Sequence, residues 1–387
     1  MEDSVLPTLS VLVPVVVAAI LAWIGARTLA SGPKPVQRAL DETNGGLRKV
    51  HAVATPRVGG VAVAIGVAGG ALACATLEGH AGRWLLLLAC VSPAFVWGLI
   101  EDVSKRQAVL PRLVLPALGA ALGFVLLDAR LTELDIPLVD EFLAVNAVAF
   151  LFTAFAVTGT THSVNVIDGL NGLAGVTSLL AAIGLAIVAA MVGDGFILHG
   201  SLVLAAAVAG FLLVNYPSGR IFLGDGGAYL IGLLLAELSV MLVQRNSEVS
   251  PWFPPVLLAF PIWETIFSMF RRRFRGHSTA RADGLHLHQL IYRRVVRWRG
   301  FSRSPAHRTA RNSIASLYLW VVPAVCLIVA VAFWDDSRML QAIGVSYWIA
   351  YGLVYRTLVR FRVPRWLVVK VAEPLASLDE DRAGLRR

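Results

Sequence analysis

The sequence predicts an all-α integral membrane protein with about eleven transmembrane helices. Hydrophobic residues make up 57% of its 387 residues. Apolar runs of roughly twenty residues recur along the chain, and each is long enough as a helix to cross about 30 Å of hydrocarbon. Lys and Arg are spread unevenly over the segments between these runs. The apolar runs therefore predict the fold class, and the charges predict its orientation in the membrane.

The apolar runs define the predicted spans in order along the chain. They cover residues 5–26, 59–77, 84–100, 109–127, 142–161, 171–192, 196–215, 226–243, 252–270, 314–333 and 339–359. The longest polar segment between them, 271–313, is expected to contain a further helix from Asp283 to Trp298. Neither a repeat nor a low-complexity segment divides the chain, so a single multi-span domain is predicted over residues 1–360, with a polar tail over 361–387.

Thirty of the 34 Lys and Arg residues fall in alternate segments, which predicts that these segments face the cytoplasm. The basic segments are 27–58, 101–112, 216–225, 271–313 and 356–387, and the remaining four basic residues are Arg83, Arg130, Arg245 and Arg338. The N-terminus is then outside and the C-terminus is cytoplasmic. The net charge of +9 reflects topology and contact with anionic lipids, so no nucleic-acid partner is expected.

Polar residues gather at the predicted cytoplasmic ends of the spans. Lys49, His51 and Arg57 precede Gly59 and Gly60, which open the second span. Cations and free backbone N–H groups of this kind can bind a phosphate. A basic loop before a span explains the same residues equally well, so both interpretations stay open at this segment.

Two adjacent carboxylates, Glu101 and Asp102, follow the third span beside Lys105 and Arg106. Such a pair can bind Mg²⁺ or accept a proton from a phosphate nucleophile. The alternative is a helix-end pair neutralised by the two basic residues. Because acidic residues run against the basic bias of this side of the membrane, the functional interpretation is favoured.

A polar segment within the predicted cytoplasmic loop 162–170 and the start of the next span carries Asn165, Asp168 and Asn171 among glycines. This composition is typical of a loop that presents polar side chains to a ligand. Capping of the next helix explains Asn171 but not all three residues.

A fourth polar segment follows Asn215 and contains Phe222, Gly224 and Asp225. Asp225 at a helix N-terminus can hold a hard cation, while backbone N–H groups hold the phosphate that the cation bridges. A dinucleotide-binding interpretation of the glycines is rejected, because no strand precedes them.

The fifth segment contains Asp283, His286 and His288. The two histidines are two residues apart, so one helix cannot direct both side chains the same way, and the i, i+4 spacing of a zinc site is absent. Contact with a phosphate or a nucleotide fits these residues better than zinc.

Together the five segments resemble the polyprenyl-phosphate N-acetylhexosamine-1-phosphate transferase family. They are more similar to its bacterial branch acting on UDP-N-acetylhexosamines than to the branch acting on the peptidoglycan pentapeptide. The resemblance runs in the family's order from about residue 27 to 298. It implies a multi-pass protein of the bacterial inner membrane with its active site on the cytoplasmic face.

The resemblance also implies residue roles. Glu101 and Asp102 match the family's acidic pair, whose second member is implied to activate the acceptor phosphate. Asp225 matches the Mg²⁺ ligand, and Phe222 matches an aromatic residue that stacks on uracil. Two departures are Glu101, where the family usually has Asp, and Gln289, where it often has a third His.

Further matches surround the implied nucleotide. Asn171 and Asn215 match positions that contact the uridine, and Asp168 and Asn165 match polar positions near the diphosphate. Four other residues match the basic positions near the phosphates or the cytoplasmic histidine motif: Lys49, Arg112, His286 and His288.

The implied reaction transfers N-acetylhexosamine 1-phosphate from a UDP-sugar to undecaprenyl phosphate, releases UMP and starts cell-surface polysaccharide synthesis, such as O antigen, lipopolysaccharide or cell wall. Its expected cofactor is Mg²⁺, with Mn²⁺ as a substitute. The partners are both substrates and the lipid bilayer, with a homodimer left open. Direct displacement is preferred to a covalent phospho-enzyme at Asp102.

Two other classes of function compete with this interpretation. An ion-coupled transporter would use buried carboxylates, for which Glu237 and Glu264 are candidates. Glu264, however, lies only about six residues, or roughly 9 Å, from the predicted cytoplasmic end of its span, so it can equally support an active site. A non-catalytic scaffold would leave the acidic and Asn-rich segments unexplained.

Overall fold

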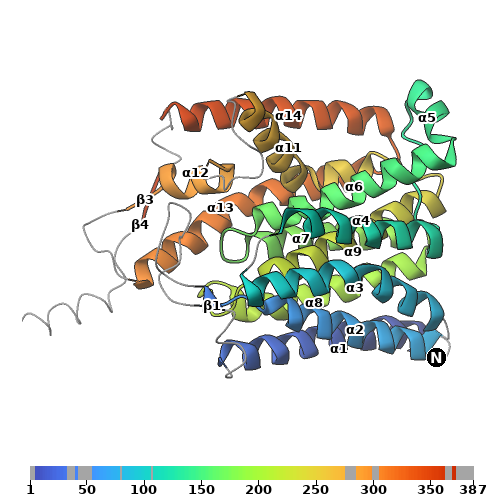
Figure 1. Ribbon diagram of the computed structural model, residues 1–387, viewed down its shortest axis with the longest axis horizontal. Helices are drawn as coiled ribbons and strands as arrows, with labels where there is room; N and C mark the ends of the chain where they lie inside the picture. Colours follow the sequence, from blue (N-terminus) through green and yellow to red (C-terminus); the bar gives the residue numbers. More distant parts are fainter. Residues whose placement is uncertain are drawn as a thin grey trace, which may run out of the picture.

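The computed structural model describes residues 5–32, 40–41, 55–78, 81–105, 108–274, 285–298, 305–361 and 368–371. In these residues the chain forms a bundle of long helices with two pairs of short strands. The long helices run side by side along the longest axis of the molecule (Figure 1). The prediction of an all-α polytopic membrane protein is confirmed.

The elements are long helices and a smaller number of short helices and strands. The long helices are α1 (Val5–Ala30), α2 (Gly59–Glu78), α3 (Ala81–Ser104), α4 (Val109–Leu126), α6 (Asn146–Ile167), α7 (Leu173–Met191), α8 (Gly195–Asn215), α9 (Gly224–Arg245), α11 (Ala259–Phe274), α13 (Pro305–Ala332) and α14 (Ser337–Val359). The short helices are α5 (Pro137–Leu143), α10 (Phe253–Leu257) and α12 (Leu287–Arg294). Antiparallel strands β1 (Leu40–Asp41) and β2 (Thr55–Pro56) form one pair, and parallel strands β3 (Val296–Trp298) and β4 (Val369–Val371) form the other.

Nine helices of the described chain are long and apolar enough to cross a membrane, namely α1 to α4, α6 to α9 and α13. The other two predicted spans also form helices, as the α10–α11 pair and α14. The predicted span 252–270 is interrupted at Leu258, because Pro261 has no N–H to donate to the carbonyl of Leu257. The predicted span 142–161 begins late: its first residues end α5, and α6 begins only at Asn146.

The helix predicted over 283–298 is shorter than expected. The described helix α12 ends at Arg294, and Val296–Trp298 pair with Val369–Val371 as parallel strands. β-Branched residues at 295 and 296 favour the extended conformation once a partner strand is present. The prediction of a continuous helix was therefore wrong at its C-terminal end.

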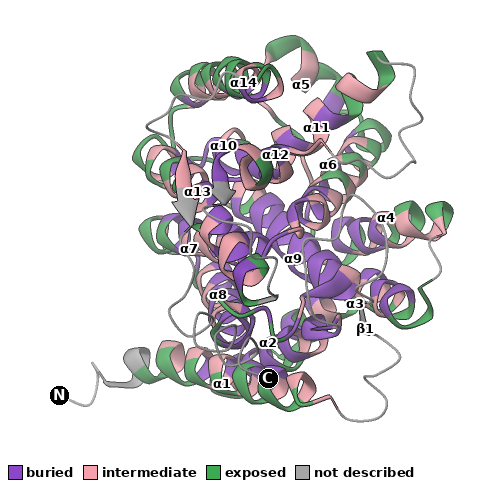
Figure 2. Cartoon of the chain, turned by 90° about the vertical axis from the view of Figure 1, so that its left-hand side faces the viewer, coloured by how far each residue is buried: buried purple, intermediate pink, exposed green. Residues whose placement is uncertain are grey.

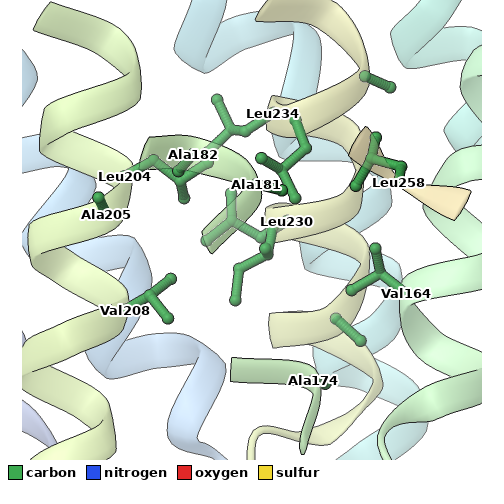
Figure 3. Close-up of a cluster of buried hydrophobic side chains, with 14 of the residues drawn as sticks. Val164, Ala174, Ala181, Ala182, Leu204, Ala205, Val208, Leu230, Leu234 and Leu258 are labelled. Carbon is green, nitrogen blue, oxygen red and sulfur yellow. The ribbon is translucent and has the colours of Figure 1, made fainter. Parts of the chain in front are cut away.

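Helix α9 is the centre of the bundle. Figure 2, which views the molecule from the left of Figure 1, shows it buried and surrounded by the other helices. Small side chains such as Ala181, Ala182 and Ala205 let α7 and α8 approach Leu230 and Leu234 of α9 (Figure 3). Large apolar side chains are exposed on the outside of the bundle, as expected where helices face lipid.

Candidate active site

The site is built at the end of the bundle where α3 ends and α9 begins. Asp102, near the C-terminus of α3, accepts hydrogen bonds from the backbone N–H groups of Asp225 (3.0 Å) and Gly226 (3.0 Å). These groups belong to the first turn of α9, whose N–H groups have no partner within their own helix. Asp102 therefore caps α9 from a neighbouring helix.

Gly224 makes this contact possible. Its backbone has φ of +79°, and a Cβ atom at this position would lie 2.5 Å from Oδ2 of Asp102 and 2.5 Å from the carbonyl oxygen of Arg57. A side chain would therefore force Asp102 away from α9. Because the N–H groups of Asp225 and Gly226 donate to Asp102, the expectation that the start of α9 offers them to a phosphate was wrong.

The start of α2 is also occupied by protein contacts. The N–H of Gly59 donates to the carbonyl of Phe222 (2.8 Å), and that of Gly60 donates to the carbonyl of Leu223 (2.8 Å). These glycine N–H groups are thus not available to a phosphate, which was one of the two interpretations left open from the sequence. They instead hold the segment before α9 against α2.

Two arginines surround Asp225. Nη2 of Arg57 lies 3.6 Å from Oδ1 of Asp225, and Nη2 of Arg112 lies 3.6 Å from Oδ2. Nε of Arg112 also bonds both oxygens of Glu101, at 2.8 and 2.9 Å, and Nε of Arg57 lies 3.6 Å from Asp102. The predicted residues Glu101, Asp102, Arg112 and Asp225 therefore lie in one cluster.

Asp225 is held for a ligand on its remaining side. Asn165 donates a hydrogen bond to Oδ1 of Asp225 (2.8 Å), and the Asp225 side chain keeps 18% exposure. The described cluster holds four carboxylates, Asp168 included, against two guanidinium groups, so it carries excess negative charge. A divalent cation bound beside Asp225 would neutralise that excess charge.

The residues that the structure describes form no preformed cage for a metal. Among the described residues, no group of three or more His, Cys, Asp or Glu side chains is arranged to hold an ion. Mg²⁺ at phosphoryl-transfer sites is usually held by one or two carboxylates and completed by substrate phosphates and water. Asp225 suits that mode of binding.

Asp168 follows the last residue of α6 and lies beside this cluster. Burial raises the pKa of Asp168 to about 7, with Asp225 acting in the same direction and Arg57 in the opposite direction. The carboxyl of Asp168 therefore changes protonation near neutral pH, which is the range required of a general acid or base.

The two predicted uridine contacts, Asn171 and Asn215, both make hydrogen bonds inside the protein. The Asn215 side chain accepts from the N–H of Gly172 (2.7 Å) and donates to the carbonyl of Ile221 (2.7 Å). Asn171 donates from its side chain to the carbonyl of Pro217 (3.1 Å), and its own N–H donates to Oδ1 of Asn312 (2.7 Å). Both residues join the loop before α7 to the loop before α9.

Capping of α7 by Asn171 is not observed, because no side chain caps that helix. Phe222 lies in the second of the two joined loops and is partly buried, with its N–H bonded to the carbonyl of Pro56 (2.8 Å). The backbone of Phe222 is therefore fixed at both its N–H and its carbonyl, which accepts from Gly59. Its contact with a uracil ring stays a prediction.

The histidine segment packs against the Asp168 loop. A Cβ atom on Gly169 would lie 2.6 Å from Nε2 of His288, so the two segments are in direct contact. The rings of His286 and His288 stack with centroids 5.4 Å apart. His288 is 1% exposed, and burial lowers its pKa to about 4, so its ring is neutral at physiological pH.

His286 is oriented by Glu264 of α11. Nδ1 of His286 lies 3.0 Å from Oε1 of Glu264, which also accepts from the N–H of Leu287 (2.8 Å). The other oxygen of Glu264 accepts from the hydroxyl of Tyr351 (2.9 Å). The sequence-based suggestion that Glu264 supports the active site is thus in agreement with its contacts.

Three predicted residues, Lys49, His51 and Asp283, lie outside the described residues. Sequence reasoning assigned no role to Asn312 or Tyr351, which hold Asn171 and Glu264 from distant helices. Nothing in the local sequence around either residue indicates these contacts. Tyr351 lies within a predicted apolar span, whereas Asn312 lies in the polar segment before one.

Comparison with known proteins identifies relatives of this chain. Residues 84–243 match the model of glycosyl transferase family 4. A Bacillus subtilis protein named "probable undecaprenyl-phosphate N-acetylglucosaminyl 1-phosphate transferase" is 30% identical over 245 residues, which are 63% of this chain and 67% of that protein. The decaprenyl-phosphate N-acetylglucosaminephosphotransferase of Mycolicibacterium smegmatis is 25% identical over 81% of this chain and 80% of its own length. A phospho-N-acetylmuramoyl-pentapeptide-transferase of Desulforudis audaxviator is 29% identical over 72% of this chain and 90% of its own length.

Proposed function

Because the chain belongs to glycosyl transferase family 4, we propose that it transfers an N-acetylhexosamine 1-phosphate from a UDP-sugar to a polyprenyl phosphate and releases UMP. The observation that carries the proposal is the position of Asp225, which lies between Arg57 and Arg112 and accepts from Asn165. These groups lie together at the polar end of a membrane bundle. A lipid phosphate and a soluble sugar nucleotide meet at such a surface.

Both substrates are anionic, so the site has to offset the repulsion between them. Arg57 and Arg112 supply cationic groups, and Asp225 is the residue that would hold Mg²⁺, with Asp168 beside it. Bound Mg²⁺ supplies charge stabilisation of the phosphoryl group in transfer. Mg²⁺ dependence is part of the proposal, with Mn²⁺ as a substitute.

The reaction forms one bond and breaks one bond. An oxygen of the polyprenyl phosphate attacks the β-phosphorus of the UDP-sugar, and the bond from that phosphorus to the bridging oxygen breaks, so that UMP leaves with the electron pair. The product is a polyprenyl diphospho-sugar. Because phosphoryl transfer depends mostly on positioning and on charge stabilisation, direct displacement is preferred.

Two carboxyl groups can take a proton from the acceptor phosphate. Asp102 was the candidate from the sequence, but both of its oxygens accept backbone N–H groups and its side chain is 1% exposed. Asp168 is half-buried, whereas Asp102 is buried. We therefore assign proton acceptance to Asp168 and positioning of Asp225 to Asp102.

The histidine segment completes the site next to Asp168. Glu264 accepts a hydrogen bond from Nδ1 of His286, which fixes the orientation of the ring. We propose that the oriented ring of His286 contacts a phosphate of the nucleotide. His288 supports His286 by stacking and by packing on Gly169.

Asn171 and Asn215 act in this proposal by holding the loops that carry Asp168 and Phe222. The transporter alternative is rejected, since the relatives of the chain are transferases and Glu264, one of its two candidate carboxylates, is bound to His286. Phe222 is proposed to stack on the uracil.

The test is to incubate the purified protein with undecaprenyl phosphate, Mg²⁺ and one UDP-sugar at a time, and to identify the lipid product by mass spectrometry. UDP-N-acetylglucosamine, UDP-N-acetylgalactosamine and the UDP-N-acetylmuramoyl pentapeptide separate the two branches represented among the relatives. We expect product from an N-acetylhexosamine and none from the pentapeptide. Product from the pentapeptide alone would contradict the proposal.

A further inference from the structure

A second polar feature lies between α11 and α14, away from Asp225. The two helices enclose a cavity of about 590 Å³, here called the α11–α14 cavity, whose lining consists almost entirely of aromatic and arginine side chains. The residues that matter for the argument are Phe270, Arg271 and Phe274 of α11, Trp348 and Arg356 of α14, and Arg360, which directly follows α14. Figure 1 shows the two helices next to each other at one side of the bundle.

The cavity is cationic, and none of the described residues that line it is acidic. Arg356, in the last turn of α14, and Arg360, the residue that follows the helix, are exposed and four residues apart, so their charges repel each other. Within the described residues neither of these two side chains has a carboxylate partner. A bound anion would relieve the repulsion and pair with both.

The residues around the cavity are of the types that lie at the interface between a bilayer and water. Phe270, Phe274 and Trp348 are large, exposed apolar side chains at its edge. Further along α14, Ile349 and Leu353 are exposed as well. Aromatic and arginine residues gather at the headgroup level of bilayers, and basic pockets between helices bind anionic headgroups there.

Direct contacts connect the cavity to the histidine segment. Arg271 donates to the carbonyl of Leu285 (2.6 Å) and to the hydroxyl of Tyr355, which itself donates to the same carbonyl (3.1 Å). Leu285 directly precedes His286. Side chains that are held in place in the lining of the cavity therefore also hold the backbone that carries His286.

We propose that the α11–α14 cavity binds the phosphate headgroup of an anionic phospholipid through Arg356 and Arg360. The acyl chains lie along the exposed apolar residues of α14. Occupancy holds Tyr355 and Arg271 in place and so stabilises the segment that begins at Leu285. This lipid is not a substrate, and its binding is independent of the transfer reaction proposed above.

Native mass spectrometry of the detergent-purified full chain tests the proposal, with phosphatidylglycerol or phosphatidylcholine added in turn. The double variant Arg356→Gln/Arg360→Gln removes the two charges. Arg338→Gln is the matched control, because Arg338 is an exposed arginine on the same helix outside the cavity. Inorganic phosphate is added in a separate arm to distinguish a lipid from a free ion.

We expect the wild-type chain and Arg338→Gln to retain phosphatidylglycerol in preference to phosphatidylcholine. The double variant should bind phosphatidylglycerol roughly 25-fold more weakly, at about five-fold for each arginine near an anionic headgroup. Hydrogen exchange of the Leu285–Leu290 backbone should slow with phosphatidylglycerol in the wild-type chain and in Arg338→Gln, but not in the double variant. A thermal unfolding curve shows whether the double variant is folded.

Four results would overturn the proposal. One is equal retention of both lipids by the wild-type chain, and another is wild-type affinity in the folded double variant. The third is dimer formation that the double variant abolishes without any lipid preference, which would assign the cavity to a second copy. Displacement of phosphatidylglycerol by inorganic phosphate would assign it to a free ion and also contradict the proposal. Since lipid retention is measured without turnover, failure of the transfer reaction would leave this result unaffected.

Discussion

Replacement of Glu264 by Gln isolates the effect of a buried charge on the histidine segment. Glu264 accepts three hydrogen bonds, from His286, Leu287 and Tyr351. A Gln side chain has the same shape, and its amide oxygen can keep the bonds from His286 and Leu287. Its amide nitrogen can donate to the hydroxyl oxygen of Tyr351. The segment should therefore stay in place while the charge next to His286 is lost.

The expected magnitude follows from the loss of charge in one hydrogen bond. A hydrogen bond to a charged group contributes about 1.5–3 kcal/mol, against about 0.5–1.5 kcal/mol for a neutral one. The difference of about 1–1.5 kcal/mol corresponds to roughly a ten-fold fall in kcat if His286 contacts a phosphate in the transition state. Because the bound nucleotide still reaches the ring of His286, KM should change much less.

Steady-state formation of the lipid-linked product measures this effect, and Glu237→Gln is the matched control. Glu237 is a fully buried carboxyl on α9 whose two oxygens have no hydrogen-bond partner among the described residues. Its replacement should leave kcat within about two-fold of wild type, since a buried site without partners loses no specific contact. Equal losses in both variants, or wild-type kcat in Glu264→Gln, would refute the assignment of Glu264 as a positioning residue.

The remaining predictions concern three other positions and the acidic pair. Asp225→Asn should lower kcat by roughly a thousand-fold, because an amide is a poor Mg²⁺ ligand; near-normal turnover at saturating Mg²⁺ in the folded variant would disprove the metal assignment. Phe222→Ala should raise the KM for the UDP-sugar by roughly ten-fold if the stack contributes about 1–3 kcal/mol, and an unchanged KM would place the base elsewhere. Asp102→Asn should lower kcat more than Glu101→Gln and should also lower the melting temperature, because its amide nitrogen would face an N–H donor of α9; the reverse order would contradict the capping role. Burial lowers the pKa of His288 to about 4 in the folded state. As the pH falls, this histidine is therefore protonated in the unfolded chain before it is protonated in the folded chain. The free energy of unfolding of the wild-type protein should fall by about 2 kcal/mol between about pH 7.5 and about pH 5. His288→Gln should lack that contribution, and an identical pH dependence in thermal unfolding of the two proteins would argue against the buried neutral ring.

Much of the fold could be predicted because membrane spans depend on local composition. Each apolar run becomes a helix without help from distant residues, since the backbone must satisfy its own hydrogen bonds in lipid. The pairing of β3 with β4 could not be predicted in this way, because the partner of Val296–Trp298 lies beyond two long helices. The break between α10 and α11 at Leu258 could have been predicted from the sequence, because Pro261 lacks the backbone N–H that would continue α10 into α11.

The residues of the site could be predicted better than their contacts. Asn165 and Asn215 belong to equally polar segments, yet Asn165 donates to Asp225 while Asn215 joins two backbone segments. The side-chain chemistry of Asn is the same in both cases, so only the three-dimensional arrangement distinguishes a residue beside the ligand from a residue that holds a loop. The same applies to Gly59, whose N–H is bonded to Phe222.

The acidic pair shows why the two neighbouring carboxylates tolerate change differently. Adjacent residues of a helix point about 100° apart, so the end of α3 can serve two neighbours at once. Glu101 bonds to the guanidinium of Arg112, whereas Asp102 bonds to the backbone of Asp225 and Gly226. An arginine side chain can follow a carboxylate that is one methylene longer, and a helix backbone cannot. A Glu in place of the family's usual Asp is therefore accommodated at position 101, while a longer side chain at position 102 would push Asp225 away from both arginines.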